Sequence, residues 1–514
     1  MVDPGDTFRG IFRNGLGVAA GSARASLFEF QQMTIELAIL LVAIPAFWAF
    51  AEWRLGLLLC LVTAILQDPL RKLTPDQPVL FVGLVVLVFG AACVGAWARG
   101  VSLGPNSIFS RYWQFAMPSA LLVLLIIVQA FNSYLRFNNP IMPLMGLLTY
   151  VMPLPSIVLA YQLVSRQGEF RIIQFMKWYI VCISLTLTTV YLEFSGYQLP
   201  VLGQVGPKFI VYDKFIGAAL LSSSGLFRAS EIAAWHSMTA ACFVVLLILL
   251  RRINFTRLLT AAIVVALLIG VGVLTGRRKI VIEFAVFVST YFVLWTILEN
   301  GAGRLVVIAM ITVAVIVNTI FAAELRDNVP QRIAIWRNSG EYSSYVRRSE
   351  AVFQDAPSRF VAIGMAPVMW AYSSFGLFGG GLGVGTQGTQ YFGGGGADAA
   401  AAEGGLGKIT LELGIPGLFL IGWIGILFLR YVWGIIRVTS RYSPKIARLT
   451  IGLFSFLVAN VAGFSVATQA YGDLFILLIL SWTLGFLLAV PVLLEREVGA
   501  RQPAIYEELA LIPA

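Results

Sequence analysis

The sequence predicts an all-α, polytopic membrane protein, and three observations lead to that prediction. Of the 514 residues, 59% are hydrophobic and only 12% are charged, whereas soluble globular proteins carry about 25% charged residues. Apolar runs recur along nearly the whole chain, and most are long enough for α-helices that cross about 30 Å of hydrocarbon. The short alternating strands of an outer-membrane barrel do not fit these runs.

The apolar runs locate the expected transmembrane helices, about 12–13 in number. The run at 55–67 is short, so we suspect a half-helix or a miscounted hairpin there. The expected spans are residues 33–50, 55–67, 78–97, 114–131, 141–164, 172–193, 231–250, 256–275, 279–298, 304–322, 413–434, 446–467 and 473–494.

The connections between these runs define the expected organisation of the chain. Residues 1–32 form a cytoplasmic or interfacial segment, without the pattern of a cleavable signal peptide. Membrane helices follow over 33–322, with an outer loop near 194–230, and again over 413–494, before a cytoplasmic tail at 495–514. Between them, residues 323–412 form a loop too long to be a simple connection, so we expect it to carry the active site.

The net charge of +10 is spread over short loops and is not gathered into one stripe, which argues against nucleic acid as a partner. Cytoplasmic loops are enriched in Lys and Arg, so the connections holding Arg251 and Arg257, and Arg437 and Lys445, are placed in the cytoplasm. Counting spans outward from them puts both long loops on the extracytoplasmic face. The same count puts the turn "TGRRK" there, against the usual tendency, so its charges need another explanation.

The composition gives little indication of a metal site or of a bound cofactor. The chain has one histidine and four cysteines, and the cysteines all lie inside apolar runs without metal-ligand spacing. We therefore expect no metal site and no cofactor.

The stretch "FGGGLGVGTQGTQYFGGGGADAAAAEGGLGKITLELGIPG", residues 378–417, departs most clearly from the apolar pattern. It contains G-x-G-x-x-G, but not the strand and helix that a dinucleotide site requires, and the residue after Lys408 is wrong for a phosphate loop. Glycines such as Gly383 and Gly385 let the backbone approach a bulky ligand closely. A flexible linker would have the same composition. Against a linker, the stretch carries Glu403 and then Glu412 at the mouth of the next span.

Arginines gather on the same expected outer face. Arg228 lies in "GLFRASEIAAWH" before one span, and Arg277 and Arg278 form the turn between two others. Guanidinium groups bind phosphate in a bidentate manner and stay charged, so these residues predict a site for an anionic lipid headgroup or pyrophosphate. Ordinary anchoring in the headgroup layer is the alternative. Residues 330–357, which include Arg347, suit amphipathic helices either on the membrane surface or against the protein.

Taken together, these motifs resemble the O-antigen ligase and polymerase family of bacterial envelope glycosyltransferases. The resemblance covers roughly residues 226–423 and is carried by "LTGRRKIVIEF", "GGGLGVGTQG" and "EGGLGKITLELGIPGLFLIGW", together with the many spans and the long outer loop. It implies a GT-C type membrane enzyme in the bacterial inner membrane. Such an enzyme transfers glycan from undecaprenyl pyrophosphate on the extracytoplasmic face, without a nucleotide sugar or a metal.

The resemblance also implies roles for individual residues. Many ligases have a histidine where this chain has Glu403, which favours a polymerase-like member with Glu403 as the general base for the acceptor hydroxyl. Arg228, Arg277 and Arg278 would hold the pyrophosphate leaving group. Loop support would come from Gly383, Gly385, Arg347, Lys408 and Glu412.

The expected function is therefore polymerisation or transfer of polyprenyl-pyrophosphate-linked oligosaccharide units in O-antigen or exopolysaccharide assembly. The expected partners are the lipid-linked glycan, membrane lipids, a chain-length regulator and a flippase. A ligase that passes the glycan to a lipid acceptor is one alternative, and a transporter or flippase of a lipid-linked glycan is another. A transporter would carry paired ionisable residues or broken helices within the bilayer, whereas the charges here concentrate at one rim.

Overall fold

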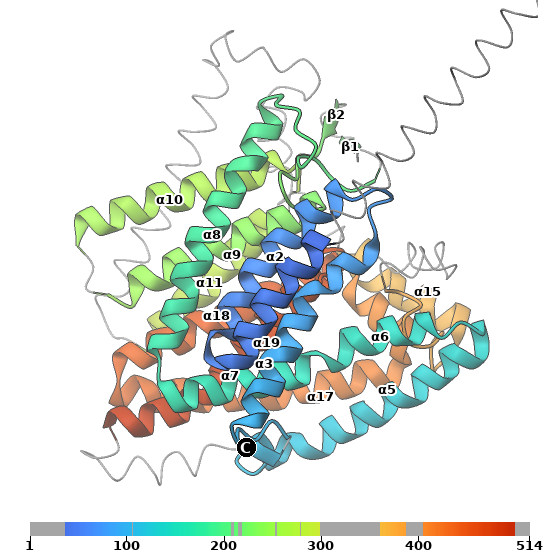
Figure 1. Cartoon of the computed structure of the whole chain (residues 1–514). Coiled ribbons are helices and arrows are strands. Elements are labelled where there is room, and N and C mark those ends of the chain that lie inside the picture. The colour runs from blue at the N-terminus through green and yellow to red at the C-terminus, as the bar shows by residue number, and fades with distance from the viewer. Residues whose placement is uncertain are drawn as a thin grey trace, which may run out of the picture.

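The computed structural model describes residues 36–104, 106–206, 210–213, 218–251, 254–277, 279–298, 360–386 and 404–498. It is helical throughout, apart from one short hairpin (Figure 1). The helices are α2 (Gly56–Leu73), α3 (Leu84–Ala98), α4 (Asn106–Phe109), α5 (Ala116–Phe137), α6 (Ile141–Val151), α7 (Pro153–Gln167), α8 (Phe170–Phe194), α9 (Ser230–Leu249), α10 (Phe255–Leu274), α11 (Lys279–Leu298), α15 (Ala366–Phe375), α17 (Gly405–Tyr442), α18 (Pro444–Val466) and α19 (Leu474–Val498).

Within the described ranges, 11 helical segments are long and apolar enough to cross a membrane, which makes the chain a polytopic membrane protein. One of these segments, Ile141–Gln167, combines α6 and α7. The expected span at 33–50 corresponds to a shorter apolar helix, Glu36–Ala51. The expected span at 304–322 lies outside the described residues.

The suspected half-helix at 55–67 is wrong, because α2 is a full-length helix that continues to Leu73. Its last two turns contain Asp68, Arg71 and Lys72, which ended the apolar run in the sequence. These polar side chains are satisfied by contacts with other segments of the protein, so the helix does not end where hydrophobicity ends.

The outer loop near 194–230 contains the only departure from helix among the described elements. Strand β1 (Ile210–Asp213) pairs antiparallel with β2 (Ala218–Leu221). Figure 1 shows this hairpin beyond the end of the bundle at which α8 ends and α9 begins.

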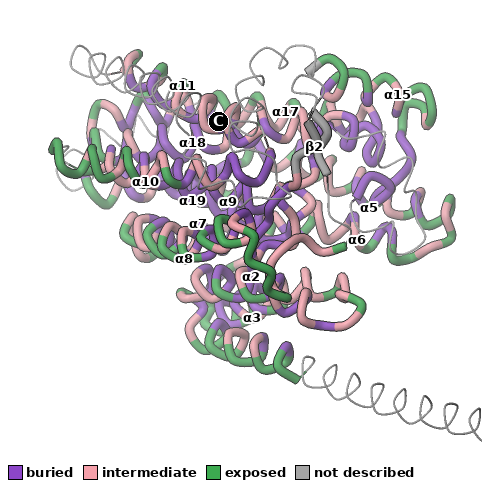
Figure 2. The backbone as a smooth tube through the Cα atoms, turned by 90° about the horizontal axis from the view of Figure 1, so that it is seen from above, coloured by how far each residue is buried: buried purple, intermediate pink, exposed green. Residues whose placement is uncertain are grey.

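The core of the bundle is built around α9 and α19. These two helices have the largest buried share among the candidate spans, and buried segments gather around them in Figure 2. A helix that is apolar on all sides is typical of a buried position. Peripheral helices instead expose large apolar side chains such as Phe131, Phe419 and Val461, as expected where a span faces lipid.

The two ends of the bundle are held by different ion pairs. Contacts at one end join Asp68 of α2, Arg228 before α9 and Asp473 before α19, and we call this end the Arg228 face. At the opposite face, Arg111 pairs with Glu495, and Lys445 pairs with Glu169. Asp68, near the end of α2, therefore lies at the same face as Arg228.

Helix α17 is broken near its start. Gly414 has φ 72° and ψ −171°, which are not helical, and Pro416 follows inside the element. Proline lacks a backbone N–H and disrupts a helix interior. The backbone exposed by the break is paired with the preceding segment, because Ile415 N donates to Leu377 O at 2.9 Å and Gly380 N donates to Leu411 O at 2.7 Å. The "GIPG" motif therefore divides α17 into a short entry helix and a long span.

Residues 379–386 of the glycine-rich stretch are packed and do not form a free linker. Gly381 and Gly383 have φ values of +108° and +87°, which favour glycine. A Cβ at Gly381 would lie 2.8 Å from the Ser133 backbone of α5, and one at Gly383 would lie 2.1 Å from Met142 O of α6. We call residues 379–386 the glycine loop, and its glycines are required where it crosses these helices.

We predict that Gly383→Ala lowers the free energy of unfolding by more than about 1 kcal/mol, because the new side chain meets both an unfavourable φ and the Met142 carbonyl. Thermal unfolding of the purified protein in detergent measures the effect. Gly422→Ala is the matched control, since nothing lies within 4 Å of a Cβ at that position. Equal melting temperatures for the two variants would contradict the assigned packing.

Candidate functional site

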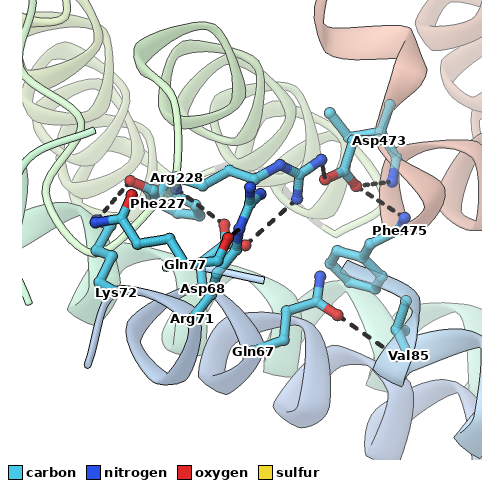
Figure 3. A network of polar contacts seen from close by, with 11 residues as sticks. Gln67, Asp68, Arg71, Lys72, Gln77, Val85, Phe227, Arg228, Asp473 and Phe475 are labelled. Atoms are coloured by element: carbon cyan, nitrogen blue, oxygen red, sulfur yellow. Dashed lines mark hydrogen bonds and ion pairs between the residues drawn. The ribbon is translucent and has the colours of Figure 1, made fainter. Parts of the chain in front are cut away.

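Arg228 is held between two buried carboxylates at the Arg228 face (Figure 3). Its Nη1 lies 3.3 Å from Asp68 Oδ1, and its Nη2 lies 2.6 Å from Asp473 Oδ2. Its backbone N–H also donates to Asp68 Oδ2 at 3.0 Å. Burial alone would lower the pKa of the Arg228 guanidinium, but the carboxylates of Asp473 and Asp68 outweigh burial and raise that pKa above its ordinary value. The guanidinium is thus committed to an internal network.

The two ends of this network are fixed by backbone groups. Asp473 Oδ1 accepts from the N–H groups of Phe475 and Ile476 at 2.8 and 3.0 Å, so this carboxylate caps α19. Lys72 Nζ donates to the carbonyls of Gly225 and Phe227, both at 2.7 Å. These contacts join α2, the segment before α9 and the start of α19. Figure 3 shows Lys72 with Phe227, and Asp473 with Phe475.

Arg277 occupies a second charged cluster at the start of α9. Its Nη2 lies 2.5 Å from Glu231 Oε1, and its Nε donates to Ser230 Oγ at 3.0 Å. Ser230 is two residues from Arg228, so Arg228 and Arg277 lie at the same helix start. Arg278 lies outside the described residues.

Glu412 binds the glycine loop. Its Oε1 accepts from Gly385 N at 3.0 Å and from Thr386 Oγ1 at 2.9 Å, and its Oε2 accepts from Tyr150 Oη of α6 at 2.8 Å. The side chain is fully buried. A buried carboxylate with three donors is satisfied, so Glu412 ties the entry helix of α17, the glycine loop and α6 together. We call these residues the Glu412 site.

A cavity of about 450 Å³ lies beside the Glu412 site, within the size range of ligand sites. Its polar lining residues include Tyr150, Lys408, Asn460 and Tyr471. Lys408, Asn460 and Tyr471 come from helix ends near the Arg228 face. The remaining wall is mostly apolar, and much of it comes from positions deeper in α17, α18 and α19: Ile421, Phe428, Leu457, Leu480 and Leu484.

The cavity reaches the surface of the molecule. Val461 lines it and is 68% exposed. A cavity that is polar toward one face, apolar toward the membrane interior and open at the side has the shape and chemistry for an amphiphile.

The predicted site residues fall into three groups. Gly383, Gly385, Lys408 and Glu412 lie together: a Cβ at Gly385 would be 3.2 Å from Lys408 Cγ and 3.4 Å from Glu412 Oε1. Arg228 and Arg277 lie together at the start of α9. The third group, which is Glu403, Arg278 and Arg347, lies outside the described residues.

Sequence reasoning missed several polar residues around the cavity. The most informative are Lys279 and Glu283 of α11, because an ionisable residue inside an apolar run is a signal of function in membrane proteins. Tyr150 and Tyr471 could not be singled out, since tyrosines within or beside apolar runs have many uses. Asp68 and Asp473 can be recognised as part of the site only from the structure, which places Arg228 between them.

The fold and site define a polytopic membrane protein with a mostly apolar cavity that is open at the surface. No protein-family model matches the chain, and no curated protein is significantly similar to it. Within the described part of the chain, no group of three or more His, Cys, Asp or Glu residues is arranged to hold a metal ion.

We predict that Arg228→Gln destabilises the protein by roughly 3–5 kcal/mol, because it leaves Asp68 and Asp473 buried without their cation. Thermal unfolding in detergent measures the loss. The exposed Arg166 of α7 gives the control Arg166→Gln, which should change stability by less than about 0.5 kcal/mol. A stable Arg228→Gln variant would show that the network is dispensable.

We predict that Glu412→Gln loosens the glycine loop, because an amide cannot accept all three hydrogen bonds with the strength of a carboxylate. The rate of amide hydrogen exchange in residues 379–386 should rise roughly 10-fold or more. Such a rise corresponds to a loss of about 1.5–3 kcal/mol in the free energy of opening this loop. Tyr150→Phe should produce a smaller rise in the same segment. Glu52→Gln, at a solvent-exposed position, should produce none, and unchanged exchange in Glu412→Gln would refute the anchoring role.

Proposed function

We propose that the protein is a membrane glycosyltransferase of the GT-C type that polymerises or transfers oligosaccharide units carried on polyprenyl pyrophosphate. It would act on the extracytoplasmic face of the bacterial inner membrane, during assembly of O-antigen or exopolysaccharide. The observation that carries the proposal is the cavity, which combines an apolar wall that reaches the surface at Val461 with polar residues toward the Arg228 face.

The cavity suits the lipid part of such a substrate. An isoprenoid chain requires an apolar wall that can be entered from the bilayer, and Val461 lies at such an opening. Lys408 is buried and supplies a cation at the cavity wall, where a phosphate attached to the chain would be attracted. Arg277 and Arg278 remain the proposed pyrophosphate ligands, whereas we now propose that Arg228 organises the face from within its ion network.

Glu403 remains the proposed general base, and both flanks of its segment support that role. On one side, Thr386 is bonded to Glu412. On the other, a Cβ at Gly404 would lie 2.0 Å from Ile363 O and 3.0 Å from Ser465 O, so this residue is closely packed between the α15 region and the end of α18. Glu403 directly precedes Gly404, and Lys408 of the cavity wall follows a few residues later. A carboxylate at residue 403 could accept the proton of an acceptor hydroxyl.

The test uses the purified full-length protein in nanodiscs with a defined polyprenyl-pyrophosphate oligosaccharide. We predict a ladder of longer lipid-linked products, and we predict that Glu403→Gln slows its formation roughly 10²- to 10⁴-fold, because general-base assistance contributes that much to rate. Asp398→Asn, an acidic residue of the same stretch, is the matched control and should retain activity. An active Glu403→Gln variant would remove Glu403 as the base.

The same assay separates the ligase alternative. A ligase gives a single transfer to an added lipid acceptor and no ladder, whereas a polymerase extends glycan that stays on polyprenyl pyrophosphate. Absence of both products would refute the enzymatic proposal.

A transporter or flippase of a lipid-linked glycan is the second candidate, and two observations favour it. Helix α17 is broken at Gly414, and Glu283 and Glu412 are fully buried within candidate spans. Discontinuous helices and buried ionisable residues are typical of transporters. Movement of a fluorescent lipid-linked oligosaccharide across a proteoliposome bilayer, without a change in its length, would favour this candidate.

A further inference from the structure

The first turns of α11 contain an ionisable pair that has no part in the proposed reaction. Lys279 and Glu283 are four residues apart and therefore share one side of the helix. Glu283 is fully buried. Among the residues that the structure describes, neither Lys279 Nζ nor Glu283 Oε2 has a hydrogen-bond partner, although both atoms are buried. A buried donor and a buried acceptor without partners are unfavourable, so the pair is suited to a ligand that would satisfy both.

The pair lies directly behind the polar end of the cavity. Tyr471 Oη donates to Glu283 Oε1 at 3.3 Å, and the Lys279 ammonium lies 6.0 Å from the centroid of the Tyr471 ring. Tyr471 and Asn460 both line the cavity. Asn460 is fixed in turn, because its Oδ1 accepts from Trp235 Nε1 at 2.7 Å.

Helix α18 leaves room for the carboxylate only because residue 463 is glycine. A Cβ at Gly463 would lie 2.0 Å from Glu283 Oε1 and 2.7 Å from Tyr471 Oη. The carboxylate is therefore accommodated by the packing of α11 against α18. The cluster of Arg277, Glu231 and Ser230 lies at the start of α9, and α9 packs beside α11.

The two unpartnered atoms restrict the chemistry of a ligand. Glu283 Oε2 requires a donor, and Lys279 Nζ requires an acceptor. A hydroxyl group satisfies both. A phosphate oxygen could accept from Lys279, but the negative charge of Glu283 would repel it, and an ammonium group could only donate.

We propose that Lys279 and Glu283 form a subsite for a hydroxyl of an uncharged sugar, carried by an amphiphile whose apolar chain lies in the cavity. The proposal rests on the proposed function in taking the ligand to be a lipid-linked glycan. It adds that the first sugar is recognised from inside the membrane domain by a carboxylate that disfavours an anionic group at the same place.

The test compares two probes with the same chain and different heads, dodecyl glucoside and dodecyl phosphate. Full-length protein is held in amphipol, and binding is measured by native mass spectrometry. We expect the wild type to bind dodecyl glucoside, and Glu283→Gln to bind it roughly 10- to 100-fold more weakly, as for loss of a hydrogen bond to a charged group. Binding of dodecyl phosphate should be unchanged or stronger in Glu283→Gln.

Two further variants complete the experiment. Lys279→Met should also weaken dodecyl glucoside binding, and it keeps the proposal testable if Glu283→Gln does not fold. Glu495→Gln, the same change at the opposite face, should alter neither probe. Wild-type affinity for dodecyl glucoside in a folded Glu283→Gln or Lys279→Met variant would overturn the subsite.

The binding experiment tests the subsite independently of the proposed enzymatic activity, because binding requires no turnover. A protein that binds dodecyl glucoside through Glu283 but forms no glycan product would refute the enzymatic proposal alone. A protein that forms the product ladder while its Glu283→Gln variant binds dodecyl glucoside normally would refute the subsite alone.

Discussion

The bond between Arg228 and two buried aspartates is the interaction on which the Arg228 face depends. Charges removed from water are costly unless they are paired and hydrogen-bonded, and this network pairs one cation with Asp68 and Asp473 at 3.3 and 2.6 Å. Because the three residues come from α2, the segment before α9 and the start of α19, the pairing fixes three helix ends relative to one another. The cavity lies beside one of these helix ends, the start of α19, and is lined there by Tyr471.

The second constraint is the break in α17. A continuous helix at this position would satisfy its own backbone and would leave the glycine loop without partners. The break at Gly414 instead presents Leu411 O and Ile415 N to residues 377–380, and it places Glu412 where it can accept from Gly385 and Thr386. The glycine loop and the broken helix therefore depend on each other, and both contribute to the region beside the cavity.

Two tyrosines connect the cavity to buried carboxylates. Tyr150 donates to Glu412, and Tyr471 donates to Glu283, while the same tyrosines line the cavity. In both cases the phenol oxygen keeps lone pairs that can accept from a ligand. The cavity is thus mostly apolar but is bordered at its polar end by acceptors whose orientation is fixed, which is the arrangement that the proposed sugar subsite uses.

The sequence by itself determined the membrane class and the approximate bounds of most spans, because hydrophobic runs of bilayer length have few alternatives. It also singled out Gly383, Gly385, Arg347, Lys408 and Glu412 as support for one loop, and the structure places the four of them that it describes side by side. Only the tertiary structure decided that α2 continues past its apolar run, that Arg228 is bonded to Asp68 and Asp473, and that Glu283 stands behind Tyr471. These contacts are between residues far apart in the sequence. A single sequence does not show which distant charged residues pair with one another.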